Sequence, residues 1–225
     1  MRIVAISDTH MVHDDYGITE MPAIPDGDIL IHAGDFSFRG RKHEIFKFSK
    51  WFHSLPHKHK ILIAGNHDLG FEDHPNESLA ILQGKDPSYW EAPLPNICTY
   101  LRDSEITIDG VRIYGAPWSP RFFDWAFNVD RGPLIKAKWD LIPDGIDVLV
   151  THGPPMGFGD ITVRDGRVGC EELALAIKRV KPKVHIFGHI HLGYGVYQDN
   201  GTVFVNASMC DETYYPANPP IVVDL

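Results

Sequence analysis

The stretch VHIFGHIH, residues 184–191, places two histidines at alternate positions directly after an apolar run. The run Val184–Phe187 has the length and the β-branched residues of a buried strand, and Gly188 allows a sharp turn where that strand ends. Residues two apart on an extended segment point the same way, so His189 and His191 are expected to face one target. The segments that follow the other strands indicate what this target is.

Four other short apolar runs also end in a polar side chain that can bind a metal. Together the runs predict five strands, at residues 2–7, 28–32, 60–64, 147–150 and 184–187. The polar residues that follow them are Asp8 and His10, then Asp35, then Asn66, His67 and Asp68, then His152, and finally His189 and His191. In α/β sheets the carboxyl ends of the strands form the active crevice, so these segments are expected to converge.

Between these strands the apolar spacing changes to the helical period. Residues 42–54 and 171–180 carry apolar side chains on one face, and residues 134–139 form a shorter candidate helix. Alternating hydrophobicity around Asp109-Gly110 and Asn200-Gly201 predicts two hairpins. No repeat or linker rich in Gly or Ser divides the 225 residues, so we expect residues 1–225 to form a single α/β domain with more than one sheet.

The composition excludes several classes of protein. Hydrophobic residues make up 44% of the chain, which excludes a disordered protein, and no apolar run approaches the ~20 residues that span a bilayer. The formal net charge of −9 argues against extended binding to nucleic acid or to an anionic membrane. Cys98, Cys170 and Cys210 fit neither a disulfide framework nor a CxxC site, so the cytoplasm is the expected compartment. The sequence predicts no particular oligomeric state.

The side chains at the five strand ends are imidazoles, carboxylates and an amide, without a thiolate. This donor set suits divalent Mn, Fe, Zn or Co and argues against a structural zinc site. The set is too large for one tetrahedral ion and about sufficient for two, and two ions roughly 3.5–4 Å apart are the usual device for displacement at phosphorus. We therefore expect two divalent metal ions, with manganese as the first choice.

The motifs resemble, in their order, those of the calcineurin-like metallophosphoesterases. They are DxH at 8–10, GD at 34–35, GNHD at 65–68, THGPP at 151–155 and GHxH at 188–191. Longer stretches resemble the small metallophosphoesterase-domain-containing subfamily: HAGDFSFRG, ILIAGNHD, YGAPWSP, THGPPMGFGD and VFVNAS. Some members of that subfamily lack a histidine in the GHxH element, which is complete here. The resemblance runs from Met1 to about the last strand. It implies a four-layer αββα sandwich in which two mixed β-sheets are flanked by helices.

The same resemblance implies a role for each motif residue. One ion would be held by Asp8, His10, Asp35 and His191, and the other by the bridging Asp35 with Asn66, His152 and His189. The implied reaction is in-line attack of a metal-bound hydroxide on a phosphodiester, with cyclic nucleotides among the expected substrates. His67 would assist the leaving group, and Asp68 would orient His67 by a hydrogen bond.

The residues that contact the substrate are less visible in the sequence. Arg39 lies close to Asp35 and is a candidate for a bidentate phosphate contact, and Asn206 follows a strand and is expected to face the site. The aromatic segment 118–127 fits either stacking on a base or a place in the core. A small phosphoester, with nucleotides among the candidates, is the expected partner.

Two alternatives to a phosphodiesterase stay open. A phosphomonoesterase or a small nuclease would use the same residues. The fold also serves as a protein-interaction platform in a retromer subunit whose metal site is impaired. The complete set of ligand residues and the presence of His67 favour an enzyme over a platform.

Several histidines outside the motifs have simpler expected roles. His32 and His185 are expected in the core, with His32 also a candidate to support the site. Solvent exposure is expected for His53, His57 and His59, which flank Pro56 in a Lys-rich turn, and a polar loop for His13-Asp14-Asp15.

Overall fold

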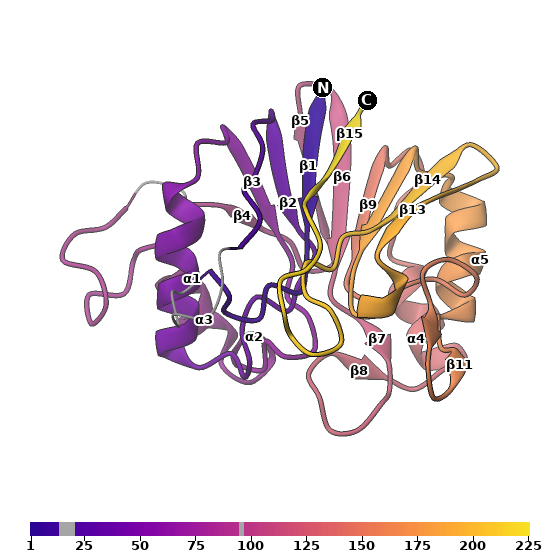
Figure 1. Cartoon of the computed structure of the whole chain (residues 1–225), viewed down its shortest axis with the longest axis horizontal. Coiled ribbons are helices and arrows are strands. Elements are labelled where there is room, and N and C mark those ends of the chain that lie inside the picture. The colour runs from indigo at the N-terminus through magenta and orange to yellow at the C-terminus, as the bar shows by residue number, and fades with distance from the viewer. Residues whose placement is uncertain (14–20, 95–96) are drawn as a thin grey trace.

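The computed structural model describes residues 1–13, 21–94 and 97–225, and it contains two main β-sheets (Figure 1). The first sheet has the strand order β15-β1-β2-β3-β4. Strand β15 pairs antiparallel with β1, and the other neighbours are parallel. The strands are β1 (Arg2–Ile6), β2 (Ile29–His32), β3 (His59–Leu62), β4 (Thr99–Tyr100) and β15 (Ile221–Asp224).

The second sheet has the strand order β13-β14-β12-β9-β6-β5. The β5-β6 and β13-β14 pairs are antiparallel hairpins, as predicted, and the central pairs are parallel. The strands are β5 (Ser104–Ile108), β6 (Val111–Ala116), β9 (Val148–Thr151), β12 (Val184–Phe187), β13 (Gly195–Asp199) and β14 (Thr202–Asn206). Two short pairs lie outside both sheets: β7 (Ser119–Pro120) with β8 (Asn128–Val129), and β10 (Ile161–Thr162) with β11 (Gly166–Arg167).

Helices cover the outer faces of both sheets (Figure 1). Helices α1 (Lys42–Ser54), α2 (Gly70–Asp73) and α3 (Pro75–Leu82) belong to the half with the first sheet, and α4 (Pro133–Trp139) and α5 (Glu171–Val180) to the half with the second. The αββα sandwich implied by the resemblance is therefore confirmed. Among the described residues, no helix combines the length and apolar character needed to cross a membrane.

The alternation of side chains along the strands explains this layering. In β1, Ile3 belongs to the apolar cluster between the sheets, which it shares with Val150 of β9. Its neighbour Val4 points to the opposite face, in the cluster that contains Phe48 of α1. Each fully buried aliphatic side chain contributes roughly 1.5–3 kcal/mol, so both faces of the strand hold the sandwich together.

The parallel strands of both sheets end at the same edge of the molecule, the lower one in Figure 1. The segments predicted to carry the chemistry all follow these strand ends. The fold therefore brings residues from both sheets to one place.

Candidate metal centre

The predicted ligand residues come together where the two sheets meet. The first sheet supplies Asp8 and His10 after β1, Asp35 after β2 and Asn66 after β3, and the second supplies His152 after β9 with His189 and His191 after β12. Ligand atoms lie within 4.8 Å of one another in three groups: Asp8, His10 and His191; His10, Asp35 and His67; and Asp35, His152 and His189. The structure thus contains candidate metal-ligand clusters that share Asp35 or His10.

The first cluster is organised around the carboxylate of Asp8. Nε2 of His191 lies 3.4 Å from Oδ1 of Asp8 and 3.3 Å from Nε2 of His10. Nδ1 of His191 lies 2.7 Å from the backbone carbonyl of Asp211, to which it donates, so Nε2 is the ring nitrogen that faces Asp8 and His10. The hydroxyl of Ser208 donates to Oδ2 of Asp8 at 2.9 Å.

The second cluster consists of Asp35, His152 and His189, and it is built in the same way around the carboxylate of Asp35. Nδ1 of His152 donates to the carbonyl of Ala33 at 2.9 Å, which directs its Nε2 inward. That Nε2 lies 3.3 Å from Oδ2 of Asp35 and 2.9 Å from Oδ1 of Asn66. Oδ2 of Asp35 also lies 3.9 Å from Nε2 of His10, so this carboxylate stands between the two clusters. When His152 is neutral, three acceptor atoms face one another, an arrangement that a cation stabilises.

Burial and neighbouring charges set the protonation of these groups. Burial alone would raise the pKa of Asp8, but the hydrogen bond with His191 and the nearby imidazoles outweigh it and hold the pKa well below its usual range. Burial lowers the pKa of His10 to about 4 and the pKa of His189 to about 3. For His152 and His191 burial acts in the same direction but is outweighed: Asp35 raises the pKa of His152 to about 9, and Asp8 raises the pKa of His191. Divalent transition-metal ions bind ionised carboxylates and imidazoles, and such an ion takes the place of the proton that the carboxylates favour on His152 and His191, so the residues fit the expected metals.

Four of the seven candidate ligands have a left-handed backbone. The φ angles are 51° at Asp8, 37° at His10, 56° at Asp35 and 69° at His189. This conformation is uncommon in residues other than glycine, and it persists only where the surroundings hold it. Each of these residues follows a strand end, where the chain turns sharply. Backbone strain of this kind is concentrated at functional sites.

Two motif glycines are required by close approach of the chain. A Cβ atom on Gly188 would meet Oδ2 of Asp8 and the side chain of Ser7. A Cβ atom on Gly65 would meet Oδ1 of Asp35 and the ring of His152. Any side chain at these positions would therefore displace a candidate ligand.

His67 lies half-buried beside the clusters. Its Nδ1 lies 3.0 Å from the backbone carbonyl of Phe38, and its ring stacks on Trp125 with centroids 4.2 Å apart. The prediction of a hydrogen bond between Asp68 and His67 is wrong, because both side chains have other hydrogen-bond partners. No pattern in the sequence pointed to Phe38 or Trp125 in this role.

The carboxylate of Asp68 is buried beneath the loops instead. It accepts hydrogen bonds from the backbone N–H groups of Asp35 at 2.9 Å, Ser37 at 3.1 Å and Gly65 at 2.8 Å. The hydroxyl of Ser37 donates to it at 2.6 Å. Asp68 therefore ties the loop after β2 to the loop after β3, and it positions ligands rather than His67.

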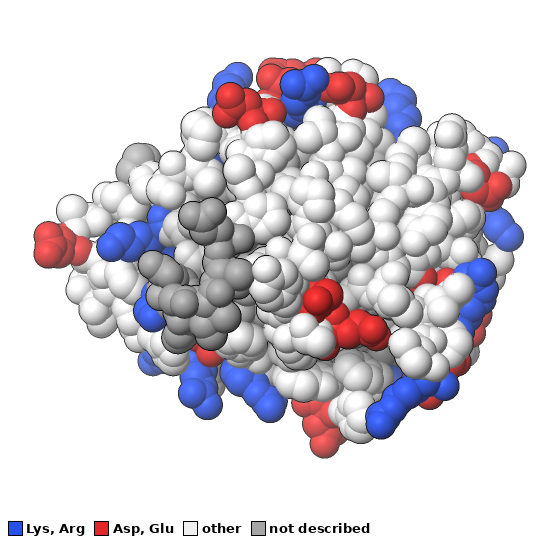
Figure 2. All heavy atoms as spheres, in the orientation of Figure 1, with Lys and Arg blue, Asp and Glu red and all other residues white. Residues whose placement is uncertain are grey.

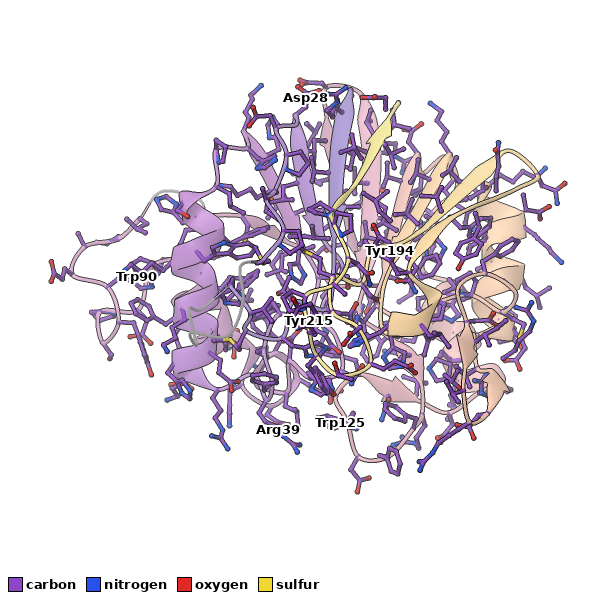
Figure 3. All side chains as sticks on the ribbon, viewed as in Figure 1. Asp28, Arg39, Trp90, Trp125, Tyr194 and Tyr215 are labelled. Carbon is purple, nitrogen blue, oxygen red and sulfur yellow. The ribbon has the colours of Figure 1, made fainter. Side chains whose placement is uncertain are left out.

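The two residues expected to contact the substrate, Arg39 and Asn206, lie in different surroundings. The guanidinium of Arg39 lies over the ring of Trp125, 4.5 Å from its centroid, and Figure 3 shows both at the lower edge of the molecule. Asn206 is fully buried, and its amide nitrogen donates to the carbonyl of Ile190 at 2.8 Å. The expectation that Asn206 faces the substrate is therefore wrong: it holds the GHIH loop in place. A phosphate contact for Arg39 stays a prediction.

A cavity of about 210 Å³ opens over the clusters. His67 lines it together with five of the candidate ligands, His10, Asp35, Asn66, His189 and His191. Phe122, Leu192, Glu212 and Tyr214 also line this cavity, and sequence reasoning missed the last two because no motif marks their loop. A larger cavity, of about 580 Å³, lies between α5 and the β13-β14 hairpin and is lined by none of the candidate ligands.

The aromatic segment 118–127 is divided between the core and the surroundings of the cavity, and stacking on a base stays a prediction. Trp118 and Phe127 are buried in the core. Phe122 is 40% exposed, and its ring packs edge-on against His189 with centroids 5.5 Å apart. Trp125 stacks on His67 as described above. The core and the cavity wall therefore share this segment.

The histidines outside the motifs are mostly placed as predicted. His32 and His185 are buried in the core. His53 is exposed and His59 is only half-buried. The expected exposure of His57 is wrong, because its Nε2 lies 2.9 Å from the carbonyl of Pro25 and the residue is buried.

The expected polar loop after β1 is described only in part. The ring of His13 stacks on Trp51 of α1 with centroids 4.9 Å apart, whereas Asp14 and Asp15 lie outside the described residues.

Comparison with known proteins agrees with the family resemblance of the five motifs. Residues 1–193 match the family described as calcineurin-like phosphoesterase. The whole chain is 47% identical over 239 residues to human "Metallophosphoesterase domain-containing protein 1", of which it covers 71%. It is also 44% identical over 236 residues to a UPF0046 protein of Caenorhabditis elegans, of which it covers 81%.

Solved structures support the fold at much lower identity. The phosphopantetheinyl hydrolase from Mycobacterium tuberculosis superposes with a TM-score of 0.59 at 16% identity, over 97% of this chain and 95% of that one. A protein of Thermus thermophilus superposes with a TM-score of 0.56 at 14% identity, over 91% of this chain and 88% of that one. These likenesses show a shared fold.

Proposed function

Since this chain belongs to the calcineurin-like phosphoesterases, we propose that it is a phosphoric ester hydrolase that holds two divalent metal ions and acts on phosphodiesters. The observation that carries this proposal is the convergence of the complete donor set around Asp35, with Nε2 of His152 and Nε2 of His191 directed inward. A protein that served only as an interaction platform would not need these nitrogen atoms buried beside carboxylates.

The proposed assignment follows the two clusters. Asp8, His10, Asp35 and His191 would hold one ion, and Asp35, Asn66, His152 and His189 the other. When bound, two divalent ions, with manganese as the first choice, lower the pKa of coordinated water and neutralise charge on the phosphoryl oxygens. Their charge of +4 exceeds that of the two carboxylates, so the site attracts an anionic ester although the chain as a whole carries −9.

His67 is proposed to assist the leaving group. Donation from Nδ1 to the carbonyl of Phe38 leaves Nε2 as the atom that exchanges a proton. Stacking on Trp125 restricts the ring, and the residue lines the cavity where the ester would bind. From this position His67 would protonate the departing alkoxide or stabilise its charge.

The first test is hydrolysis of bis(p-nitrophenyl) phosphate and of p-nitrophenyl phosphate by metal-free protein, before and after addition of Mn²⁺. We expect Mn²⁺ to stimulate hydrolysis, with the diester preferred, and Asp35→Asn to abolish the stimulation. A preference for the monoester would favour a phosphomonoesterase. No stimulated hydrolysis of either ester would support the interaction platform instead.

The role of His67 is tested by His67→Ala in the same assay. Metal content should be unchanged, and turnover should fall by about 10²–10⁴-fold, most strongly for esters with poor leaving groups. Unchanged turnover of an alkyl ester would remove His67 from the mechanism.

A small substrate and a cytoplasmic location are also part of the proposal. Figure 2 shows Lys and Arg side chains scattered around the rim of the face it presents, without a continuous basic band across that face. This distribution supports a small phosphoester, such as a nucleotide, over an extended nucleic acid. Cys98, Cys170 and Cys210 are all free thiols, which supports a reducing compartment.

A further inference from the structure

An acidic side chain lies at the cavity over the candidate metal-ligand clusters. Glu212 is exposed and lines the cavity, and it forms no ion pair with any residue in the described part of the chain. A carboxylate at this place is unexpected, because it repels the anionic substrates that the proposed metal ions attract. Its position therefore bears on which esters the site accepts.

The backbone that presents Glu212 is held firmly. Oδ1 of Asp211 accepts hydrogen bonds from the N–H of Thr213 at 2.8 Å and the N–H of Tyr215 at 3.1 Å, and the N–H of Asp211 donates to the carbonyl of Tyr215 at 2.8 Å. The carbonyl of Asp211 accepts from Nδ1 of His191, so the same turn is tied to a candidate ligand.

Tyr214 fixes the other side of this turn. Its φ is +64°, a left-handed conformation that is a genuine outlier for a bulky residue. Its ring meets the ring of His10 edge-on, with centroids 4.7 Å apart, and also packs against His191 at 5.8 Å. The turn 211–215 is therefore anchored to the first cluster by a hydrogen bond and by ring contacts, which places Glu212 close to that cluster.

We propose that Glu212 makes this site select phosphodiesters over phosphomonoesters. The proposal rests on the hydrolase function proposed above and assigns its specificity to one residue. Near neutral pH a phosphomonoester carries close to two negative charges, because its second pKa is about 6, whereas a diester carries one. The repulsion by Glu212 therefore acts about twice as strongly on the monoester.

The size of the cavity makes this repulsion effective. At about 210 Å³ it is smaller than the roughly 300–1,000 Å³ of typical small-molecule pockets, so a phosphoryl group over the clusters lies close to Glu212. The remaining ionisable groups that line it are Asp35, Tyr214 and the histidines His10, His67, His189 and His191. Arg39, the cation near the site, has its guanidinium stacked on Trp125 and does not line the cavity.

The test compares Glu212→Gln with the unchanged protein, both loaded with Mn²⁺. The measured quantity is the ratio of kcat/KM for bis(p-nitrophenyl) phosphate to that for p-nitrophenyl phosphate, between pH 5 and pH 8. Glu212→Gln should lower this ratio by about five- to tenfold at pH 8, the effect of one screened unit charge nearby, and by less at pH 5. Added salt should reduce the difference between the two proteins.

Asp109→Asn is the matched control. Asp109 is also exposed, and it lies in the β5-β6 turn at the opposite ends of the strands from the clusters. Its φ of +47° is one that asparagine tolerates, so the turn should be preserved. The control should leave the ratio of the two esters unchanged.

The outcomes separate this inference from the proposed function. If Glu212→Gln hydrolyses both esters with an unchanged ratio at pH 8, the inference is overturned while the hydrolase stands. An equal change in Asp109→Asn would also overturn it, because the effect would then come from overall charge. If the unchanged protein hydrolyses neither ester with Mn²⁺, the proposed function itself fails.

Discussion

His185 shows how a structural histidine differs from a candidate ligand. The hydroxyl of Thr151 donates to the carbonyl of Gly153 at 2.8 Å, so it accepts from Nε2–H of His185, also at 2.8 Å. Nδ1 of His185 is buried without a hydrogen-bond partner in the described part of the chain. A second proton on this ring would have no acceptor, and burial lowers the pKa of His185 to about 3.

This histidine should make stability depend on pH. Its pKa in the folded protein, about 3, lies below the value of about 6.5 in the unfolded chain, so the unfolded state binds more protons between these values. The free energy of unfolding should therefore fall as the pH drops below about 6.5, by up to about 1.4 kcal/mol per pH unit for this group. His185→Gln should remove that share of the slope, as measured by denaturant unfolding from pH 7 to pH 4.5. Equal slopes for the two proteins would contradict this prediction.

Residue types explain which contacts the sequence revealed. A carboxylate, an amide or an imidazole after a strand is visible in the sequence, so the set of candidate ligands was predictable. The acceptors that orient the rings are backbone carbonyls of Ala33, Phe38 and Asp211, and every residue type offers such a carbonyl. For the same reason the sequence suggested Asp68 as the partner of His67, where the structure has the carbonyl of Phe38.

Strand-end loops combine ligands with glycines, and the glycines are not equivalent. Gly188 precedes His189 and approaches the side chains of Ser7 and Asp8 too closely for a Cβ atom. Gly153 follows His152, but a Cβ atom there would meet its nearest neighbour, Cβ of Ser119, at an ordinary 3.4 Å. The two motifs therefore differ in how much side-chain volume they tolerate.

Gly188→Ala should disturb the first cluster and Gly153→Ala should not. Overpacking of this kind typically costs about 1–3 kcal/mol of stability, and displacement of Asp8 should weaken metal binding by at least about tenfold. The measurement is the metal content of each variant after reconstitution with Mn²⁺ and desalting, together with its thermal unfolding. A Gly188→Ala variant that retains the metal affinity and stability of the unchanged protein would show that the loop can move aside.

Elements with a clear apolar pattern were predictable, and elements without one were not. Helices α1 and α5 begin and end where the sequence pattern placed them, because each carries a clear apolar face. Helices α2 and α3 were missed, since α2 has only four residues and α3 buries Ser78 together with Ile81 and Leu82, so its sequence shows no clear apolar face. Packing of α3 against α1 and of α2 against α3, rather than helical propensity, decides that these short segments are helical.

The candidate metal centre joins the two sheets of the molecule. Asp8, Asp35 and Asn66 follow strands of the first sheet, whereas His152 and His191 follow strands of the second. Metal ions held between them would link the carboxyl ends of both sheets. Because the unfolded chain does not preserve this arrangement, metal binding should stabilise the fold.

Removal of metal should therefore lower the unfolding temperature. At free Mn²⁺ about 100 times the Kd, binding contributes about 2.7 kcal/mol per site. For a chain of 225 residues, a change of 1 kcal/mol shifts Tm by about 2–4 °C, so chelation should lower Tm by roughly 5–10 °C or more. Scanning calorimetry with and without Mn²⁺ measures this shift, and Asp35→Asn should reduce it. An unchanged Tm would argue against metal binding between the sheets.

The five main strands, the hairpins, the helices α1, α4 and α5 and the set of candidate ligand residues could be predicted from the sequence, because periodicity and residue type are local properties. The two-residue strands and β15 could not. How these residues are used depends on tertiary packing. The loop packing that surrounds Asp68 and Asn206, the stacking of Trp125 on His67 and the placement of Glu212 at the cavity all involve segments distant in the chain. Such contacts form when two sheets pack together, and a pattern within one strand or helix carries no information about them.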